Sequence, residues 1–328
     1  MTWRWGIMGT GIIAHAFADA IRAEGGRIVA VSSATPARAQ RFAADHGVEV
    51  AVHPHAALLE HSDLDVVYVA TTNERHHLDA HACLDAGIPA LVEKPFALDA
   101  DTARTVLAAA ARAEVFIAEA MWMRLQPAIT RLHAELASGT IGPPAAFQAS
   151  LGVLLDPDPT RRWRSAELGG GALLDLGVYP ATLAHDLLGP ARAVRATGRL
   201  GDTGVDLSAA VLADHDRGTA AWRCSFTDAS GVWATVAGPE GSIWIAEPFH
   251  HAPSLTLRPR DRAPVHLPIG GHELGYRYEV REVHRCLELG ALESPALRHS
   301  DTVAVLEVLD LVATQLGIRR PPVAARPV

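Results

Sequence analysis

The chain has 328 residues, 49% of them hydrophobic, which is enough for two domains with separate cores. Its net charge of −8 argues against nucleic acid or an acidic membrane as a partner, because both bind basic surfaces. We find no signal peptide pattern and no apolar run that would span a bilayer, and the three cysteines are widely spaced, so we expect a cytoplasmic protein with reduced thiols.

The N-terminal segment predicts a nucleotide-binding unit. Residues 3–8 are typical of a buried strand, residues 12–21 are apolar at helical spacing, and residues 27–31 predict a second strand. The turn between the first strand and the helix has the pattern G-x-G-x-x-A, in which the glycines allow a tight turn and a close approach to a pyrophosphate. The helix N-terminus supplies free N–H groups for the phosphates. The residues expected to contact the cofactor here are Gly9, Thr10, Gly11, Ile12 and Ile13.

The end of the second strand favours NADP over NAD. An NAD site commonly has Asp or Glu about 20 residues after the glycines, where it binds the ribose hydroxyls. Residues 32–38 contain no carboxylate, whereas Ser33 and Arg38 would suit a 2′-phosphate. Alternatively, Arg38 is a surface residue of the next helix, which we expect over residues 36–46.

A third strand and its carboxyl end add further candidates. Residues 54–61 are expected to be helical, and residues 64–70 form the apolar run of a buried parallel strand. Ligands of open α/β sheets bind at the carboxyl ends of strands, so we expect Thr71, Thr72, Asn73 and His76 to contact the cofactor. We also expect Asn73 to cap the helix that ends near residue 86. The histidines of the chain have no complete metal-ligand spacing, which predicts that there is no metal site.

The next strand leads to the only lysine of the chain. Residues 89–92 predict a strand, and Glu93-Lys94-Pro95 follows at its carboxyl end, on the same edge as the glycine turn. The other 28 basic residues are Arg, and Lys differs from Arg because its pKa can shift. We therefore expect Lys94 to be catalytic. A helix over residues 99–113 and a strand over 115–118 complete a doubly wound parallel sheet, in a first domain of residues 1–121.

The second half predicts a different architecture. A helix over residues 127–137 and a strand over 146–155 precede short strands between 191 and 267, and helices near 272–289 and 301–317 end the domain. This pattern indicates an α+β domain, residues 122–328, with an open and mainly antiparallel sheet. We expect residues 319–328 to be loosely ordered.

Asp175 and Tyr179 are the polar candidates of the second domain. Residues four apart share one helix face, so both side chains can point at one substrate. A tyrosine can give a proton to a carbonyl oxygen under hydride attack, and a nearby ammonium lowers the pKa of a phenol. The alternative is structural, with Asp175 as a helix cap and Tyr179 as a half-buried core residue.

With these residues identified, the sequence resembles the glucose–fructose oxidoreductase, inositol dehydrogenase and rhizopine catabolism (Gfo/Idh/MocA) family over nearly its whole length. The segments that carry the resemblance are the glycine turn, residues 70–77, Glu93-Lys94-Pro95, residues 119–124, residues 170–179, residues 238–241 and residues 278–295. Glu-Lys-Pro after a strand is the most specific of them.

The resemblance implies roles for several residues. It implies that Glu93, Lys94 and Pro95 lie beside the nicotinamide, that Pro95 follows a cis peptide bond, and that Tyr179 is the acid/base of a Tyr-containing branch with dihydrodiol dehydrogenases and sugar ketoreductases. That branch often has Arg where this chain has Ala34, so more of the NADP preference falls to Arg38. The residues that it implies for the substrate pocket, besides Asp175 and Tyr179, are Trp122, Arg124, Arg161, Arg162 and Trp163.

Together these features predict an NADP-dependent oxidoreductase that acts on a secondary alcohol or ketone of a sugar-like or cyclic diol substrate, with NAD as the other possible cofactor. In this hypothesis Lys94 polarises the oxygen, Tyr179 transfers the proton and Asp175 orients the substrate. One alternative is a ketoreductase of nucleotide-linked deoxysugars, whose diphosphate would meet Arg161 and Arg162. Alternatives of another class are a redox-silent NAD(P)-sensing regulator and an NAD-dependent glycosidase. An open sheet needs covering, so we expect a homodimer or homotetramer.

Overall fold

The computed structural model describes residues 2–61 and 63–322. The chain divides into two compact units. The first contains the residues up to Trp122 together with Tyr276–Thr302, and the second contains Met123–Gly275 and Val303–Pro321. The sequence analysis placed the whole of residues 122–328 in a second domain, whereas the segment Tyr276–Thr302 clusters with the first unit. Most of the tail that we expected to be loosely ordered, residues 323–328, lies outside the described residues.

The first unit alternates strands and helices. Its elements are β1 (Arg4–Met8), α1 (Ile12–Ala23), β2 (Arg27–Ser32), α2 (Pro36–His46), β3 (Val50–Val52), the 3₁₀-helix η1 (His55–Glu60), β4 (Val66–Val69), the 3₁₀-helix η2 (Asn73–Arg75), α3 (His76–Asp85), β5 (Ala90–Glu93), α4 (Ala100–Ala113), β6 (Ile117–Ala120) and the later helix α7 (Arg277–Glu288). Two further elements, the 3₁₀-helix η3 (Trp122–Leu125) and α8 (His299–Leu316), each have residues in both units.

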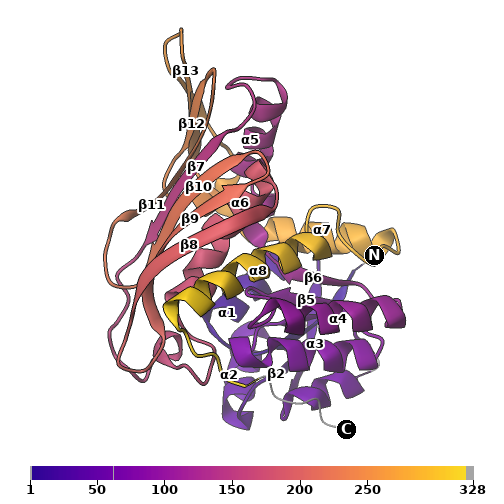
Figure 1. Cartoon of the computed structure of the whole chain (residues 1–328). Coiled ribbons are helices and arrows are strands. Elements are labelled where there is room, and N and C mark those ends of the chain that lie inside the picture. Colours follow the sequence, from indigo (N-terminus) through magenta and orange to yellow (C-terminus); the bar gives the residue numbers. More distant parts are fainter. Residues whose placement is uncertain (1, 62, 323–328) are drawn as a thin grey trace. The chain divides into compact units, whose positions relative to one another are not determined.

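In the described part of the first unit, six parallel strands form one sheet in the order β3-β2-β1-β4-β5-β6. This is the classic dinucleotide-binding order, whose crevice opens where β1 and β4 diverge, at the carboxyl ends of the strands. Figure 1 labels β2, β5 and β6 of this sheet, with α3 and α4 beside it. The middle strands are apolar on both faces because helices cover the sheet on both sides, and β4 is buried throughout. The prediction of a doubly wound parallel sheet is therefore confirmed.

Two local expectations differ from the structure. The segment expected as a helix over residues 54–61 is the shorter 3₁₀-helix η1. The strand β3 was not predicted, because its three residues are only half-buried and carry too little pattern to be recognised.

The second unit is built on a second sheet. Its elements are α5 (Pro127–Ala137), β7 (Ala146–Gly152), the 3₁₀-helix η4 (Arg162–Arg164), the π-helix η5 (Leu173–Gly177), α6 (Val178–Leu188), β8 (Ala191–Leu200), β9 (Asp206–His215), β10 (Gly218–Ser225), β11 (Gly231–Gly238), β12 (Gly241–Ile245), the 3₁₀-helix η6 (Phe249–His251), β13 (Ser254–Pro259), β14 (Val265–Pro268) and the 3₁₀-helix η7 (His272–Leu274).

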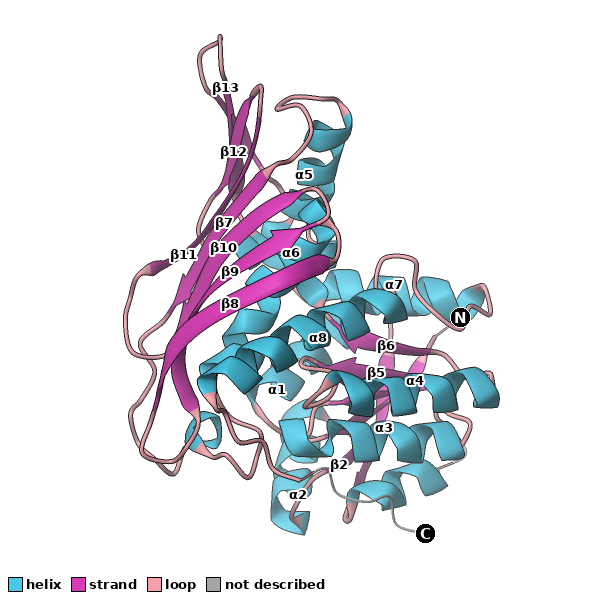
Figure 2. Ribbon diagram, viewed as in Figure 1, coloured by secondary structure: helices cyan, strands magenta, loops and turns pink. Residues whose placement is uncertain are grey.

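Within the described residues, the second sheet has eight strands in the order β14-β13-β12-β11-β7-β10-β9-β8. The pair β7 and β10 is parallel, and the other neighbouring strands in this order are antiparallel. Helix α6 packs against β7 and β10 on one face, as Figure 2 shows. Burial alternates along β9, so its other face is exposed. An open, mainly antiparallel sheet was predicted, and it is confirmed.

Candidate active site

The glycine turn of the first unit has room for a phosphate. Gly9 has φ of +105°, and a Cβ there would lie 2.1 Å from the carbonyl oxygen of Ala70, so only glycine fits. Gly11 is the N-cap of α1, and a Cβ on it would meet nothing within 4 Å. Ile12, in the first turn of α1, is 91% exposed, and Ile13 is half-buried. The free N–H groups of this helix therefore face open space, as a pyrophosphate site requires.

The end of β2 presents hydroxyl groups. Ser33 is buried, and its Oγ lies 2.7 Å from Oγ1 of Thr10, which joins this segment to the glycine turn. Thr35 is the N-cap of α2 and accepts a hydrogen bond from the N–H of Arg38. Arg38 is exposed in the first turn of that helix. The segment has no carboxylate that would repel a phosphate on the ribose.

A cavity of about 500 Å³ adjoins these segments. It lies at the carboxyl ends of β1, β2 and β3 and beside the start of α3. Its lining includes Met8, Ala34, His53, His55, Arg75 and Leu78. Such a cavity, apolar with a few polar groups, is of the size that ligand pockets have. The glycine turn and this cavity both lie at the carboxyl edge of the parallel sheet, where open α/β sheets bind their ligands.

The segment after β4 is held by its own hydrogen bonds. Thr71 Oγ1 donates to Asp79 over 2.8 Å, and Thr72 Oγ1 donates to Glu74 over 2.6 Å. His76 is buried, with Nδ1 lying 2.8 Å from the carbonyl oxygen of Pro95. His76 thus connects this segment to the one that carries Lys94.

Our expectation that Asn73 caps the following helix is wrong. Asn73 is buried inside η2, and the N-cap of α3 is Arg75, whose side chain makes no capping bond. The reason is that a 3₁₀ turn precedes the α-helix and moves its N-cap by two residues, from residue 73 to Arg75. Whether Asn73 contacts the cofactor stays a prediction.

The Glu93-Lys94-Pro95 segment leaves the sheet at the carboxyl end of β5. The Lys94–Pro95 peptide bond is cis, as the resemblance implied. Glu93 is buried and accepts hydrogen bonds from the hydroxyl of Tyr68 and, over 3.2 Å, from the N–H of Lys94. Lys94 itself is half-buried. The buried carboxylate of Glu93 therefore anchors the backbone from which the lysine side chain extends.

In the second unit, Asp175 and Tyr179 lie on consecutive elements. Asp175 belongs to the π-helix η5, and Tyr179 is in the first turn of α6. A π-helix has a wider turn than an α-helix, so a spacing of four residues no longer aligns two side chains fully. The ring of Tyr179 is buried and stacks on His250, with ring centroids 5.2 Å apart. This stacking fixes the direction in which the phenol points.

Asp206 holds the start of this segment. Its buried carboxylate accepts a hydrogen bond of 2.6 Å from the N–H of Leu173, the first residue of η5. Burial, which is partly offset by hydrogen bonds from backbone N–H groups, raises the pKa of Asp206 to about 6. Sequence reasoning missed this residue, because Asp206 lies more than 30 residues from the segment that it supports.

The residues expected in the substrate pocket have varied surroundings. Trp122, in the first unit, packs against Tyr276 with ring centroids 4.7 Å apart. In the second unit, Arg124 forms a buried ion pair with Asp186, and Arg161 pairs with Asp156 over 2.7 Å. Trp163 Nε1 donates to the carbonyl oxygen of Asp156, and Arg162 lies 3.7 Å from Asp175. Arg162 therefore lies beside the candidate residue Asp175.

Two further findings concern the described residues only. No group of three or more His, Cys, Asp or Glu side chains among them is arranged to hold a metal ion. Within residues 2–61 and 63–322, no helix is both long and apolar enough to cross a membrane.

Comparison with known proteins agrees with the nucleotide-binding geometry. Residues 3–120 match the family described as "Oxidoreductase family, NAD-binding Rossmann fold", and residues 129–244 match the GFO/IDH/MocA C-terminal domain. The chain is 32% identical over 330 residues to the trans-1,2-dihydrobenzene-1,2-diol dehydrogenase of Danio rerio, with 97% of this chain and 98% of that protein covered. The protein of the same name from Bos taurus is 29% identical over 334 residues, which cover 98% of this chain and 99% of that protein.

Solved structures of similar proteins have the same fold as this chain. A 3-ketoreductase from Actinomadura kijaniata, in complex with NADP and TDP-benzene, matches with a TM-score of 0.86 at 27% identity over 96% of this chain and 98% of that one. A levoglucosan dehydrogenase in complex with NADH and levoglucosan matches with a TM-score of 0.88 at 19% identity, over 97% and 98% of the two chains, and shows the shared fold. The chain therefore belongs to the Gfo/Idh/MocA family and is an NAD(P)-dependent oxidoreductase.

Proposed function

We propose that the protein transfers a hydride between NADP and a secondary alcohol or ketone of a cyclic diol or sugar-like substrate. The observation that carries this proposal is the similarity, over nearly the whole length, to dehydrogenases of trans-1,2-dihydrobenzene-1,2-diol. The bound nicotinamide would supply or accept the hydride. The protein contributes binding, orientation and the movement of a proton.

This proposal assigns one chemical role each to Lys94 and Tyr179. The ammonium of Lys94 donates a hydrogen bond that stabilises negative charge on the oxygen, and Tyr179 gives or removes the proton. Asp175 orients the substrate. The support for Tyr179 is its burial and its stacking on His250, which hold the phenol in one orientation. The support for Lys94 is its anchored backbone at the carboxyl edge of the parallel sheet.

We propose NADP as the preferred cofactor. The glycine turn with Thr10 and the exposed N-terminus of α1 would hold the pyrophosphate, and Ser33 and Arg38 would meet the 2′-phosphate. The absence of a carboxylate between residues 32 and 38 supports this preference. Thr71, Thr72 and Asn73 would line the path between the two halves of the dinucleotide.

The decisive experiment measures binding and turnover together. NADPH and NADH are titrated against the purified protein, and nicotinamide absorbance is followed with cyclic trans-diols, aldoses and keto-sugars. We expect Lys94→Arg and Tyr179→Phe to bind NADPH but to lose about 10²- to 10⁴-fold in kcat, the usual contribution of a general acid or base. Arg38→Ala is the matched control for the cofactor, because it should weaken NADPH and leave NADH unchanged. Binding without turnover of any substrate would refute the proposed reaction.

A ketoreductase of nucleotide-linked sugars is the second candidate. The similarity to the 3-ketoreductase crystallised with TDP-benzene favours it. Against it, Arg161 is already paired with Asp156, and Arg162 lies near Asp175, so neither cation offers a diphosphate an uncompensated charge. A nucleoside-diphosphate sugar included in the same screen separates the two candidates.

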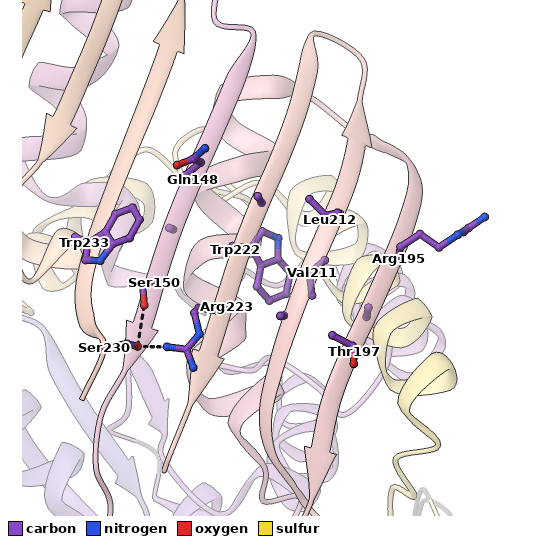
Figure 3. Close-up of a pocket in the computed structure, with 14 residues that line it drawn as sticks. Gln148, Ser150, Arg195, Thr197, Val211, Leu212, Trp222, Arg223, Ser230 and Trp233 are labelled. Carbon is purple, nitrogen blue, oxygen red and sulfur yellow. Dashed lines mark hydrogen bonds between the residues drawn. The ribbon is translucent and has the colours of Figure 1, made fainter. Parts of the chain in front are cut away.

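We also propose that the exposed face of the second sheet joins copies of this chain. A shallow pocket of about 620 Å³ lies on it, and Figure 3 shows the strands that form it. Leu212 is 64% exposed there, and Trp233 stacks on Trp244 with ring centroids 5.1 Å apart. Such exposed apolar surface marks an interface. Leu212→Glu should lower the mass measured by light scattering, whereas Leu154→Glu, at a leucine that is 73% exposed outside the sheet, should not.

The cytoplasmic location stays a prediction. The three cysteines, Cys83, Cys224 and Cys286, are buried and free, which suits a reducing compartment.

A further inference from the structure

Three carboxyl groups are buried together in the first unit, and they come from three different elements. Glu93 ends β5, Glu119 lies on β6, and Glu279 lies on α7; their residues are 7%, 6% and 0% exposed. Glutamate is almost never fully buried unless its charge is paired or neutralised. The three groups therefore need a physical explanation.

Glu93 and Glu119 hold the backbone on both sides of Pro95. Glu93 accepts from the N–H of Lys94 over 3.2 Å, and Glu119 accepts from the N–H of Phe96 over 3.1 Å. Each carboxylate also accepts a hydroxyl, from Tyr68 in one case and, over 2.9 Å, from Thr302 in the other. These hydrogen bonds hold the backbone of residues 94–96 from both sides, and we call this arrangement the clamp.

Glu279 is in a different situation. Among the residues that the structure describes, neither of its carboxylate oxygens has a hydrogen-bond partner. Burial is the main cause that raises its pKa well above the ordinary value, and the negative charges of Glu93 and Glu119 add to it. The three arginines of the same helix are paired elsewhere, Arg277 and Arg281 with Glu24 on α1 and Arg285 with Glu282.

Two phenols, Tyr68 and Tyr276, also lie at this position. Burial raises the pKa of Tyr68 well above its ordinary value, and the nearby groups Glu93, Glu279 and Tyr276 raise it further. Tyr68 is therefore a neutral hydrogen-bond donor and supplies no positive charge. Three ionised carboxylates cannot coexist at this distance from water, so one of the three keeps its proton.

We propose that Glu279 is a positioning residue for Lys94. As a neutral carboxylic acid it fills the space beside the clamp without adding a third negative charge. When it loses its proton to solvent, repulsion from Glu93 and Glu119 opens the clamp and releases the backbone that carries Lys94. The value of this device for catalysis rests on the function proposed above for Lys94, but the opening itself does not.

The proposal makes a quantitative prediction about opening. In the open state Glu279 meets water and has an ordinary pKa, while in the closed state it keeps its proton. The opening equilibrium must then rise about tenfold for each pH unit between those two pKa values. A merely structural glutamate that is paired or exposed would give no such slope.

Hydrogen exchange of the cofactor-free protein measures the opening directly. Peptides that cover residues 90–98 are followed between pH 6 and pH 8, and their protection is corrected for the intrinsic exchange rate. Protection should fall about tenfold per pH unit in the wild type, and Glu279→Gln, which is neutral at every pH, should remove this slope. Glu288→Gln, at an exposed position of the same helix, is the matched control and should keep the slope. An equal slope in Glu279→Gln, or no slope in the wild type, would overturn the proposal.

A second measurement needs no variant at position 279. Infrared spectra of the wild type at pH 8 should contain the carbonyl band of a protonated carboxyl group, which shifts in heavy water. Asp206, with a pKa of about 6, is ionised at that pH and does not contribute. If no such band is present, Glu279 is not protonated and the proposal fails. Neither measurement uses a substrate, so a failure of the proposed reaction is distinguishable from a failure of this inference.

Discussion

Asp206 offers a direct test of how the second unit is held together. Its carboxylate is 2% exposed and accepts the N–H of Leu173, where the segment with Asp175 and Tyr179 begins. Because burial raises its pKa, the folded protein binds a proton more tightly than the unfolded chain does. We expect the change Asp206→Asn to remove a pH dependence of stability that the wild type shows.

The sign and size of that dependence follow from linkage. The pKa of Asp206 is about 6 in the folded state and 3.8 in the reference state. Between these two pKa values the folded state binds more protons than the unfolded state. The stabilisation that comes from the proton on Asp206 is therefore fully present below pH 3.8 and is lost as the pH rises through 6. Each pH unit corresponds to about 1.4 kcal/mol, which gives about 3 kcal/mol in total. At pH 6 the group is half titrated in the folded state, so the contribution stops changing only about one pH unit higher.

Urea unfolding of wild type and variant at pH 4, 5, 6 and 7 measures the effect. The difference in unfolding free energy, variant minus wild type, should rise by about 2 kcal/mol from pH 4 to pH 6, rise only slightly from pH 6 to pH 7, and then stay level. Asp202→Asn, at an exposed position in the turn before β9, should give a difference that is independent of pH. A pH-independent difference for Asp206→Asn would refute the assignment of a raised pKa to this buried carboxyl.

Three further predictions concern the cofactor turn and two buried polar contacts. Gly9→Ala should prevent folding of the turn, which thermal unfolding would detect. Gly11→Ala should leave the Tm unchanged but weaken NADPH binding in a fluorescence titration, because its new methyl group enters open space that the cofactor would use. His284 accepts a hydrogen bond from Trp5, and burial lowers its pKa. The contribution of His284 to stability should therefore be constant above pH 6.5 and be lost as the pH falls below it. His284→Gln should make the fall of the Tm at low pH smaller than in the wild type. Arg124→Met should cost about 3–5 kcal/mol in urea unfolding because it leaves the charge of its buried partner uncompensated, and the double change with Asp186→Leu should recover most of it.

The parts of the fold that repeat a local pattern were predictable. The order of strand, glycine turn, helix and strand depends on residues close together in sequence, and the glycine turn was assigned from them. The parallel sheet follows because such units connect in only one hand. The return of Tyr276–Thr302 to the first unit was not predictable in this way, since no local pattern says which sheet a later helix will cover.

The candidate site shows the same limit. Thr71, His76 and Lys94 were recognised because each follows a buried strand, and their positions at the carboxyl edge need no long-range information. Asp206 and Glu279 were missed, because their importance depends on contacts made far along the chain. Glu279 had one signal that could have been used: it precedes Val280 and Val283 on the buried face of an amphipathic helix, where an acid is out of place.

The distribution of cations gives a reason why one lysine remains. Arginines serve the ordinary ion pairs, as where Arg223 pairs with Asp228 and Arg281 with Glu24, and the planar guanidinium suits such two-point contacts with carboxylates. A guanidinium, however, stays charged at every physiological pH and cannot adjust its pKa to a reaction. The backbone of Lys94 is hydrogen-bonded to Glu93, so the one tunable amine of the chain extends from a segment fixed by a buried carboxylate. On this argument selection for arginine would stop at the position where a compact, adjustable ammonium is needed, and Lys94→Arg should fold and bind cofactor yet fail in catalysis.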